Sequence, residues 1–429
     1  MSYFICSNCG FGSASWIGKC PDCGRWNTLV DRPSFAKASE GKKESVKKMK
    51  ISSFAKIKPL QKSHMKTGIF EFDRVIGYGL VPGEVILLTG EPGVGKSTLL
   101  LQALKSLKTL YISGEEAAEQ LKDRADRLKL SLGNFLFSDT IQVEGIVEGV
   151  EELKSKPDVL VIDSVQTAYS KDVDSAPGSV SQLKESTMKL INLAKREKIA
   201  VILIGHITKE GDVAGPKTLE HLVDCVLSFE GEKLSNFRIL RASKNRFGST
   251  DEIGIFEMRG AGLGEVKDPM AFMEEQAENT PGRAIVGVTE GKRPLFFEIQ
   301  TLASPTFFPV PRRVVKGVDY NKVLLLLAVI KKLLRVPLDR VDIYVNVVGG
   351  VSITSTAVDL GIIASILSAV KNLVIPSKSV FTGEVGLLGE VRKVYSEEKI
   401  VTEARRLKFK KIYSSKTIKT IAEMARIFS

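Results

Sequence analysis

Residues 85–98 read VILLTGEPGVGKST, an apolar run followed directly by a glycine-rich turn. The turn from Gly90 to Ser97 fits the pattern G-x-x-x-x-G-K-[ST] at every fixed position. Its glycines let backbone N–H groups close around phosphates, and the helix expected from Ser97 to Leu107 adds a favourable dipole. This strand–turn–helix context is that of a P-loop. The predicted nucleotide-binding residues of the turn are Gly90, Glu91, Pro92, Gly93, Val94, Gly95, Lys96, Ser97 and Thr98.

Three side chains in and near this turn are predicted to handle ATP and Mg²⁺. We expect Lys96 to reach the β- and γ-phosphates and Ser97 to bind Mg²⁺ through its hydroxyl. Asp163 ends the apolar run VLVID, a position from which a carboxylate can hold Mg²⁺ or its water. An aspartate at a strand end is often only a helix cap, but together with a P-loop the functional interpretation is favoured.

Hydrolysis also needs a group that orients or deprotonates water. Glu115 and Glu116 follow a predicted strand that ends at Ser113, and we favour Glu115 for this catalytic role. The alternative is that both acids only begin a helix, where they suit its N-terminal dipole. His206 ends another predicted strand and is a candidate sensor of the γ-phosphate, although a lone histidine is more often structural.

Four continuous apolar runs predict strands that are buried on both faces of a parallel sheet. The runs are Val85 to Gly90, Thr109 to Ser113, Val159 to Asp163 and Ala200 to His206. Between the last two runs, apolar residues recur at helical spacing. That predicted helix face consists of Val180, Leu183, Thr187, Ile191 and Ala194. The alternation of strands and helices predicts a helix-covered α/β domain.

Four of the five cysteines lie within eighteen residues, in the pattern C-x2-C, ten residues, C-x2-C. A glycine follows each pair and lets the backbone turn, so that the sulfurs face one point. Four thiolates at this spacing predict a closed, structural zinc site. The predicted ligands are Cys6, Cys9, Cys20 and Cys23. The alternative, a set of disulfides, is disfavoured in a cytoplasmic chain.

Composition limits the class of protein. The chain has 429 residues, which suggests two or three domains, and a net charge of +12, which favours a polyanionic partner such as nucleic acid. The longest clean apolar run is too short for a membrane span, and the first residues lack the pattern of a signal peptide. We therefore expect a cytoplasmic protein.

The chain is predicted to consist of four parts. They are a zinc module over 1–31, a basic flexible linker over 32–58, an ATPase domain over 59–268 and a second α/β domain over 269–429. In the last part we expect a hairpin over 280–301, an apolar helix from Asp319, a strand over 341–349 and an apolar helix from Ala357 to Val370.

The assembled motifs resemble the bacterial RadA family (also called Sms), RecA-like ATPases of DNA repair. The matching stretches are the four-cysteine module, GEPGVGKST, YISGEE, VIDSVQT, GHITKEGDVAGPKTLEHLVD and the pentapeptide KNRFG at 244–248. The residues from 311 onward resemble this family's Lon-protease-like domain. The resemblance implies a zinc ribbon-like module, a RecA-like P-loop core and a Lon-like α/β domain.

The resemblance further implies a ring-shaped, hexameric ATPase of helicase type. It would move on single-stranded DNA and promote branch migration of recombination intermediates together with RecA. Lys96, Ser97 and Asp163 would handle the nucleotide and Mg²⁺, and Glu115 looks like the catalytic glutamate of RecA-type enzymes. Loop residues Lys209, Lys217 and Tyr169 are candidates for contact with DNA.

Lys244 and Arg246 belong to the KNRFG pentapeptide. A cation supplied by a neighbouring subunit stabilises the charge that develops in phosphoryl transfer. We therefore interpret both residues as catalytic fingers that act across a subunit interface. Direct contact with DNA phosphates is an alternative, and a solvated turn ended by Gly248 is another.

Lon-type proteases use a serine nucleophile and a lysine base. Matching their pattern places Asp359 at the serine position and Glu398 at the lysine position, with Lys399 adjacent. Because a carboxylate cannot replace either group in acyl transfer, we expect no peptidase activity. A shift of this alignment by a residue or more would place Ser352, Ser355 or Lys399 at these positions instead. A Lon-type protease and a regulatory ATPase that does not translocate are therefore the alternative functions.

Overall fold

The computed structural model describes residues 3–13, 15–32, 64–206, 216–231, 236–268, 270 and 280–428. Residues 33–58 of the predicted linker and Lys209 lie outside the described residues. The chain divides into two compact units, Met1–Phe229 with Ala242–Ser249, and Glu230–Arg241 with Thr250–Ser429. In the described part of the chain, none of the helices is both long and apolar enough to span a bilayer.

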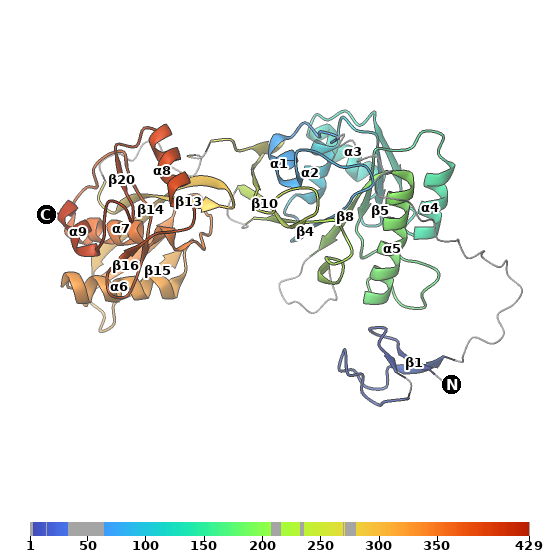
Figure 1. Ribbon diagram of the computed structural model, residues 1–429, viewed down its shortest axis with the longest axis horizontal. Coiled ribbons are helices and arrows are strands. Elements are labelled where there is room, and N and C mark those ends of the chain that lie inside the picture. The colour runs from blue at the N-terminus through green and yellow to red at the C-terminus, as the bar shows by residue number, and fades with distance from the viewer. Residues whose placement is uncertain are drawn as a thin grey trace, which may run out of the picture. The chain divides into compact units, whose positions relative to one another are not determined.

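The N-terminal module is a small antiparallel sheet (Figure 1). Its strands are β1 (Tyr3–Cys6), β2 (Gly12–Ser13) and β3 (Leu29–Arg32), in the order β2-β1-β3. Among its described residues, the buried core consists of Cys6, Cys20 and Leu29, with other apolar side chains packed against them. So small a core requires an additional source of stability, such as a bound metal.

The first unit is built on a parallel sheet, as predicted (Figure 1). Its strands lie in the order β9-β4-β8-β7-β5-β6 and pair in parallel where register is defined. Their bounds are β4 (Val85–Gly90), β5 (Thr109–Ser113), β6 (Phe135–Ser138), β7 (Val159–Asp163), β8 (Ala200–His206) and β9 (Cys225–Glu230). The four predicted runs are confirmed as strands. β4 is buried at all six positions, which explains its uninterrupted apolar sequence.

Helices cover this sheet. They are α1 (Phe70–Ile76), α2 (Lys96–Ala103), α3 (Ala118–Arg127), α4 (Val143–Glu152) and α5 (Val180–Glu197), with a 3₁₀ turn, η2, at Pro216–Thr218. α4 and α5 share one apolar core with β4, β5, β7 and β8, and the predicted face of α5 contributes Leu183 and Ala194 to it. The helix expected to run to Leu107 ends earlier, because the chain turns at Leu104 to enter β5.

Three further strands pair antiparallel with one another: β10 (Phe237–Asn245), β11 (Ile253–Arg259) and β12 (Gly262–Glu265). β10 extends through Lys244 and Asn245, the first two residues of the KNRFG pentapeptide.

The second unit contains a six-stranded mixed sheet in the order β15-β16-β14-β13-β17-β20. Its strands are β13 (Arg283–Glu290), β14 (Arg293–Pro305), β15 (Arg313–Lys316), β16 (Val341–Val347), β17 (Ser379–Phe381) and β20 (Lys411–Tyr413). A separate pair is β18 (Glu384–Val385) and β19 (Val391–Arg392). The predicted hairpin is β13 and β14.

The helices of this unit are α6 (Tyr320–Leu334), α7 (Asp359–Lys371), α8 (Glu397–Arg406) and α9 (Ile421–Ala425), with 3₁₀ turns η3 (Thr356–Val358) and η4 (Arg426–Phe428). α6 begins after Asp319, whose side chain accepts the N–H of Lys322 and caps the helix. α7 is buried over its first ten residues and forms the centre of the core.

Candidate functional site

The register of the parallel sheet brings the predicted site residues to one edge. Gly90 at the end of β4 pairs with His206 at the end of β8, and Ser113 at the end of β5 pairs with Asp163 at the end of β7. A cavity of about 280 Å³ opens at this edge. Its lining residues are Pro92, Gly93, Gly95, Lys96, Ser97, Thr98, Glu115, Glu116, Arg124, Asp163 and His206. We call it the P-loop cavity.

The glycines of the P-loop meet two different demands. A Cβ on Gly90 would lie 2.5 Å from the carbonyl oxygen of Phe229, so a side chain has no room there. Gly95 has a φ of 111°, a backbone conformation that favours glycine. The turn therefore ends with free N–H groups at the start of α2, which is a suitable site for an anion.

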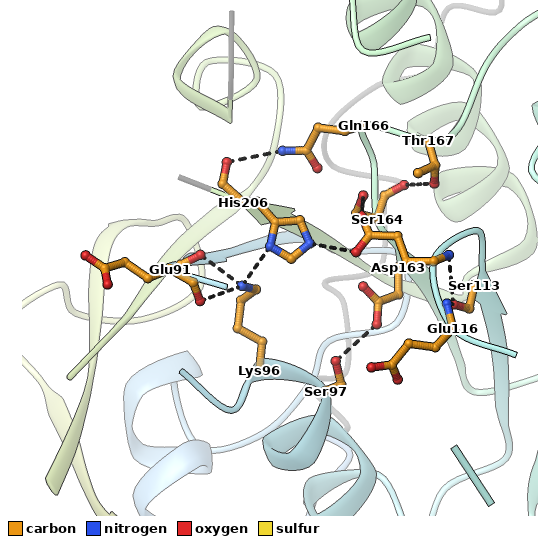
Figure 2. A network of polar contacts seen from close by, with 12 residues as sticks. Glu91, Lys96, Ser97, Ser113, Glu116, Asp163, Ser164, Gln166, Thr167 and His206 are labelled. Atoms are coloured by element: carbon orange, nitrogen blue, oxygen red, sulfur yellow. Dashed lines mark hydrogen bonds and ion pairs between the residues drawn. The ribbon is translucent and has the colours of Figure 1, made fainter. Parts of the chain in front are cut away.

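Lys96 lies inside the cavity and donates three hydrogen bonds (Figure 2). Its Nζ is 2.9 Å from the Gly90 oxygen, 3.1 Å from the Glu91 oxygen and 3.1 Å from Nδ1 of His206. Burial lowers the pKa of Lys96, and the negative charges of Asp163 and Glu115 oppose that effect.

His206 connects the lysine to a carboxylate. An ammonium can only donate, so Nδ1 of His206 must accept, and the ring proton then lies on Nε2. Nε2 is 3.2 Å from Oε2 of Glu115, and the hydroxyl of Ser164 donates to the other oxygen of that carboxylate. Lys96, His206 and Glu115 thus form one hydrogen-bonded chain across the cavity.

Asp163 is the buried acid of the site. The Ser97 hydroxyl donates to its Oδ2 at 3.1 Å and the Tyr111 hydroxyl at 2.5 Å. Burial raises the pKa of Asp163, and these two hydrogen bonds oppose that shift. One oxygen from Asp163, one from Glu115 and one nitrogen of His206 lie within 4.8 Å of one another, an arrangement that can hold a divalent cation or its water.

Sequence reasoning missed several residues at this site. Arg124 of α3 donates to both oxygens of Glu116 at 2.7 Å. Gln166 donates to the backbone oxygen of His206 (Figure 2). The sequence offered only a weak signal for Tyr111, a hydroxyl group in the interior of strand β5. Both glutamates precede α3, which begins at Ala118, so neither lies within that helix.

The two cations of the pentapeptide KNRFG lie at the opposite edge of the sheet. Arg246 Nη1 is 3.0 Å from Oδ1 of Asp224, and Oδ2 of Asp224 accepts the N–H of Val85, the first residue of β4. Lys244 donates to the backbone oxygens of Glu220 and His221. Six residues of β4 separate Arg246 from the P-loop, roughly 20 Å at about 3.3 Å per residue. Neither cation reaches the P-loop cavity of its own chain.

The N-terminal cysteines converge as predicted. Sγ of Cys6 is 3.7 Å from that of Cys23, Sγ of Cys9 is 3.5 Å from that of Cys20, and all four sulfurs lie within 4.8 Å of one another. A tetrahedral zinc ion with Zn–S bonds of about 2.3 Å separates its ligands by roughly 3.8 Å. Gly10 and Gly24, with φ of 78° and 69°, provide the turns. The four cysteines therefore fit a structural Zn²⁺ ion.

The two positions that the sequence comparison matched to a Lon-type serine and lysine hold acids in different surroundings. Asp359 is fully buried and forms an ion pair with Lys322 at 2.8 Å. Burial raises the pKa of Asp359 to about 6, while Lys322 opposes that effect. Glu398 is exposed and pairs with Lys393 and Lys416.

A P-loop at the end of a parallel sheet, with acids and a histidine at the neighbouring strand ends, defines an ATPase of the α/β class. Residues 53–212 match a family model described as an AAA domain, and residues 4–31 match one described as a rubredoxin metal binding domain. The chain is 45% identical over 420 residues to the DNA repair protein RadA of Listeria monocytogenes, covering 96% of this chain and 92% of that protein.

Two further relatives agree. The DNA repair protein RadA of Bacillus subtilis is 46% identical over 422 residues, which covers 96% of this chain and 92% of that protein. That of Aquifex aeolicus is 41% identical over 419 residues, with 97% and 93% covered. The chain therefore belongs to the RadA family of DNA repair proteins. A solved structure of the RadB recombinase matches 47% of this chain and 100% of its own, at 22% identity and a TM-score of 0.39.

Proposed function

We propose that this protein is a DNA-dependent ATPase of helicase type. It forms a hexameric ring in the cytoplasm, moves on single-stranded DNA and promotes branch migration of recombination intermediates together with RecA. The observation that supports this proposal most directly is the position of Lys244 and Arg246 at the edge of the sheet opposite to the P-loop cavity. Cations so placed can act on a nucleotide only if it is bound by a neighbouring subunit.

In this proposal, each residue of the P-loop cavity has one task. The backbone N–H groups of the P-loop and the ammonium of Lys96 hold the phosphates of ATP, which requires Lys96 to give up at least one of its three present acceptors. Ser97 and Asp163 hold Mg²⁺, which neutralises phosphate charge when bound. Glu115 orients the attacking water and accepts its proton.

His206 has a positioning role in the same scheme. When Lys96 turns toward a phosphate, Nδ1 of His206 loses its donor, while Nε2 still holds Glu115. The histidine therefore responds to the phosphate end of the nucleotide and transmits that response to the carboxylate that orients water. This is the sensing role expected from its place at the end of β8.

We further propose that the second domain is Lon-protease-like and lacks peptidase activity. Asp359, at the serine position, is engaged with Lys322 and has no route to act as a nucleophile in acyl transfer. Digestion of casein in the presence of ATP tests this point, and we expect none.

The decisive experiment measures ATP hydrolysis with and without single-stranded DNA. We expect DNA to stimulate the wild type and Lys244→Ala to reduce turnover by about 10³- to 10⁵-fold, the range for a finger acting in trans, while nucleotide binding persists. Lys122→Ala is the matched control, since Lys122 is an exposed lysine on α3 that pairs only with Asp126 among the contacts described. Turnover that ignores DNA would contradict the motor and favour a regulatory ATPase that does not translocate.

A further inference from the structure

The two tryptophans of the chain, Trp16 and Trp26, both lie in the zinc module and both are exposed. Of the two side chains, 54% of Trp16 and 69% of Trp26 is accessible to solvent. Neither packs into the core of the module, which consists of other apolar side chains and the cysteines. Exposing two large apolar rings to water is unfavourable and does not stabilise the fold of so small a module. Their exposure therefore indicates a binding role.

The rings are neighbours and at least one is held in place. A Cβ built on Gly18 would lie 3.6 Å from Cη2 of Trp16 and 3.8 Å from Cζ3 of Trp26, so both indoles border the same glycine. Nε1 of Trp16 donates to the backbone oxygen of Leu29 at 3.1 Å. Lys19 pairs with Trp26 in a β-bridge. The indoles therefore form a preorganised aromatic surface.

Positive charge accompanies these rings. Nζ of Lys19 is 5.7 Å from the centre of the Trp26 ring, and Arg25 is an exposed neighbour in the sequence. Aromatic faces next to cations match the chemistry of unpaired nucleic-acid bases, which stack while their phosphates meet the charge.

We propose that Trp16 and Trp26 form a stacking site for the bases of single-stranded DNA. The zinc ion would serve this site only by holding the module folded. Since the bases of duplex DNA are already stacked on one another, the site should select unpaired bases. The inference rests on the proposed function in its choice of DNA as ligand, but it concerns a different part of the chain from the P-loop cavity.

Because the chain has no other tryptophan, the intrinsic tryptophan emission of the intact protein reports on this site alone. We expect a single-stranded oligodeoxythymidine to quench that emission, and an abasic oligonucleotide of equal length and charge to leave it nearly unchanged. Trp16→Phe and Trp26→Phe each replace one indole by a phenyl ring, which can still stack. The tryptophan emission of each variant then comes from the remaining indole alone, so each ring is followed separately.

Affinity provides the second measurement. Loss of one stacked ring should weaken binding of the oligonucleotide by about 5- to 150-fold, so Trp26→Ala should bind more weakly and Trp26→Phe should recover most of the affinity. Val30→Ala is the matched control, because it shortens another exposed apolar side chain of the same module. Zinc content of one ion per chain verifies that each variant keeps the module folded.

The outcomes separate this inference from the proposed function. Suppose that DNA stimulates ATP hydrolysis but does not quench the emission, and that Trp26→Ala binds DNA as tightly as the wild type. The stacking site is then refuted, the proposed motor function stands, and the rings belong to a protein partner. If the bases quench the emission while hydrolysis ignores DNA, the stacking site stands and the motor fails. Equal quenching by the abasic oligonucleotide would also overturn base stacking.

Discussion

At the scale of single residues, a carboxyl is buried at Glu84, the residue directly before β4. Glu84 is 1% exposed, and its Oε1 has no hydrogen-bond partner. Burial, with a further contribution from the charge of Asp224, raises the pKa of Glu84 to about 8, while Lys195 opposes the shift. The carboxyl is therefore protonated in the folded protein at neutral pH.

Glu84→Gln should consequently stabilise the protein, and more so as the pH rises. The folded-state pKa lies above the unfolded value of 4.5, so the folded chain binds the proton more tightly and stability falls as the pH rises from 4.5 to 8. At neutral pH the gain is on the order of 3 kcal/mol, and near pH 4 it should vanish. Urea unfolding at several pH values measures this, and a gain independent of pH would contradict it.

At the scale of elements, the zinc module is the part that depends on a ligand for its fold. With Cys6, Cys20 and Leu29 as its buried core, the module has little apolar burial of its own, so metal binding supplies its folding free energy. Removal of zinc with a chelator should expose residues 3–32 to proteolysis, while the sheet of the first unit stays intact. Mass spectrometry of the fragments checks this expectation.

A pair of cysteine variants provides the control. Cys9→Ala should lose the ion, whereas Cys225→Ala, in buried strand β9, should retain one ion per chain. A module that resists protease after complete loss of zinc would show that its fold does not depend on the metal.

Elements also show how far the sequence alone leads. The strands of the parallel sheet were predictable because residues buried on both faces produce unbroken apolar runs with polar residues at their ends. The end of α2 was not, since Lys105 and Ser106 suit a helix as well as a turn. The contacts of Tyr111 with Asp163 and of Arg124 with Glu116 depend on strand register and on the placement of α3, which a local pattern does not contain.

At the scale of the whole molecule, the proposed ring makes a prediction about mixed subunits. A Lys96→Ala subunit has a disabled P-loop cavity but an intact Arg246, and an Arg246→Ala subunit has the reverse. If Arg246 acts in trans, mixing two inactive variants should restore part of the ATP hydrolysis, because some interfaces then join an intact cavity to an intact finger. Steady-state turnover of the mixture, compared with each variant alone, measures this.

The double variant Lys96→Ala/Arg246→Ala is the control for that mixture. Mixed with the Arg246→Ala subunit, it offers no intact finger and should restore nothing. Restoration by the double variant, or none by the single variants, would mean that Arg246 does not act across an interface and would favour its contact with DNA.

The central strand β4 has a further consequence for such a ring. It is buried along its whole length, hydrogen-bonded to β8 and β9, and has the P-loop at one end and the anchor of Arg246 at the other. A strand held in this way cannot stretch or bend locally, so the distance between the P-loop and the anchor of Arg246 stays fixed. A conformational change at one nucleotide site would then reach the next site as a rotation of the entire subunit. The order in which the subunits hydrolyse ATP would be set by these rigid-body rotations around the closed ring.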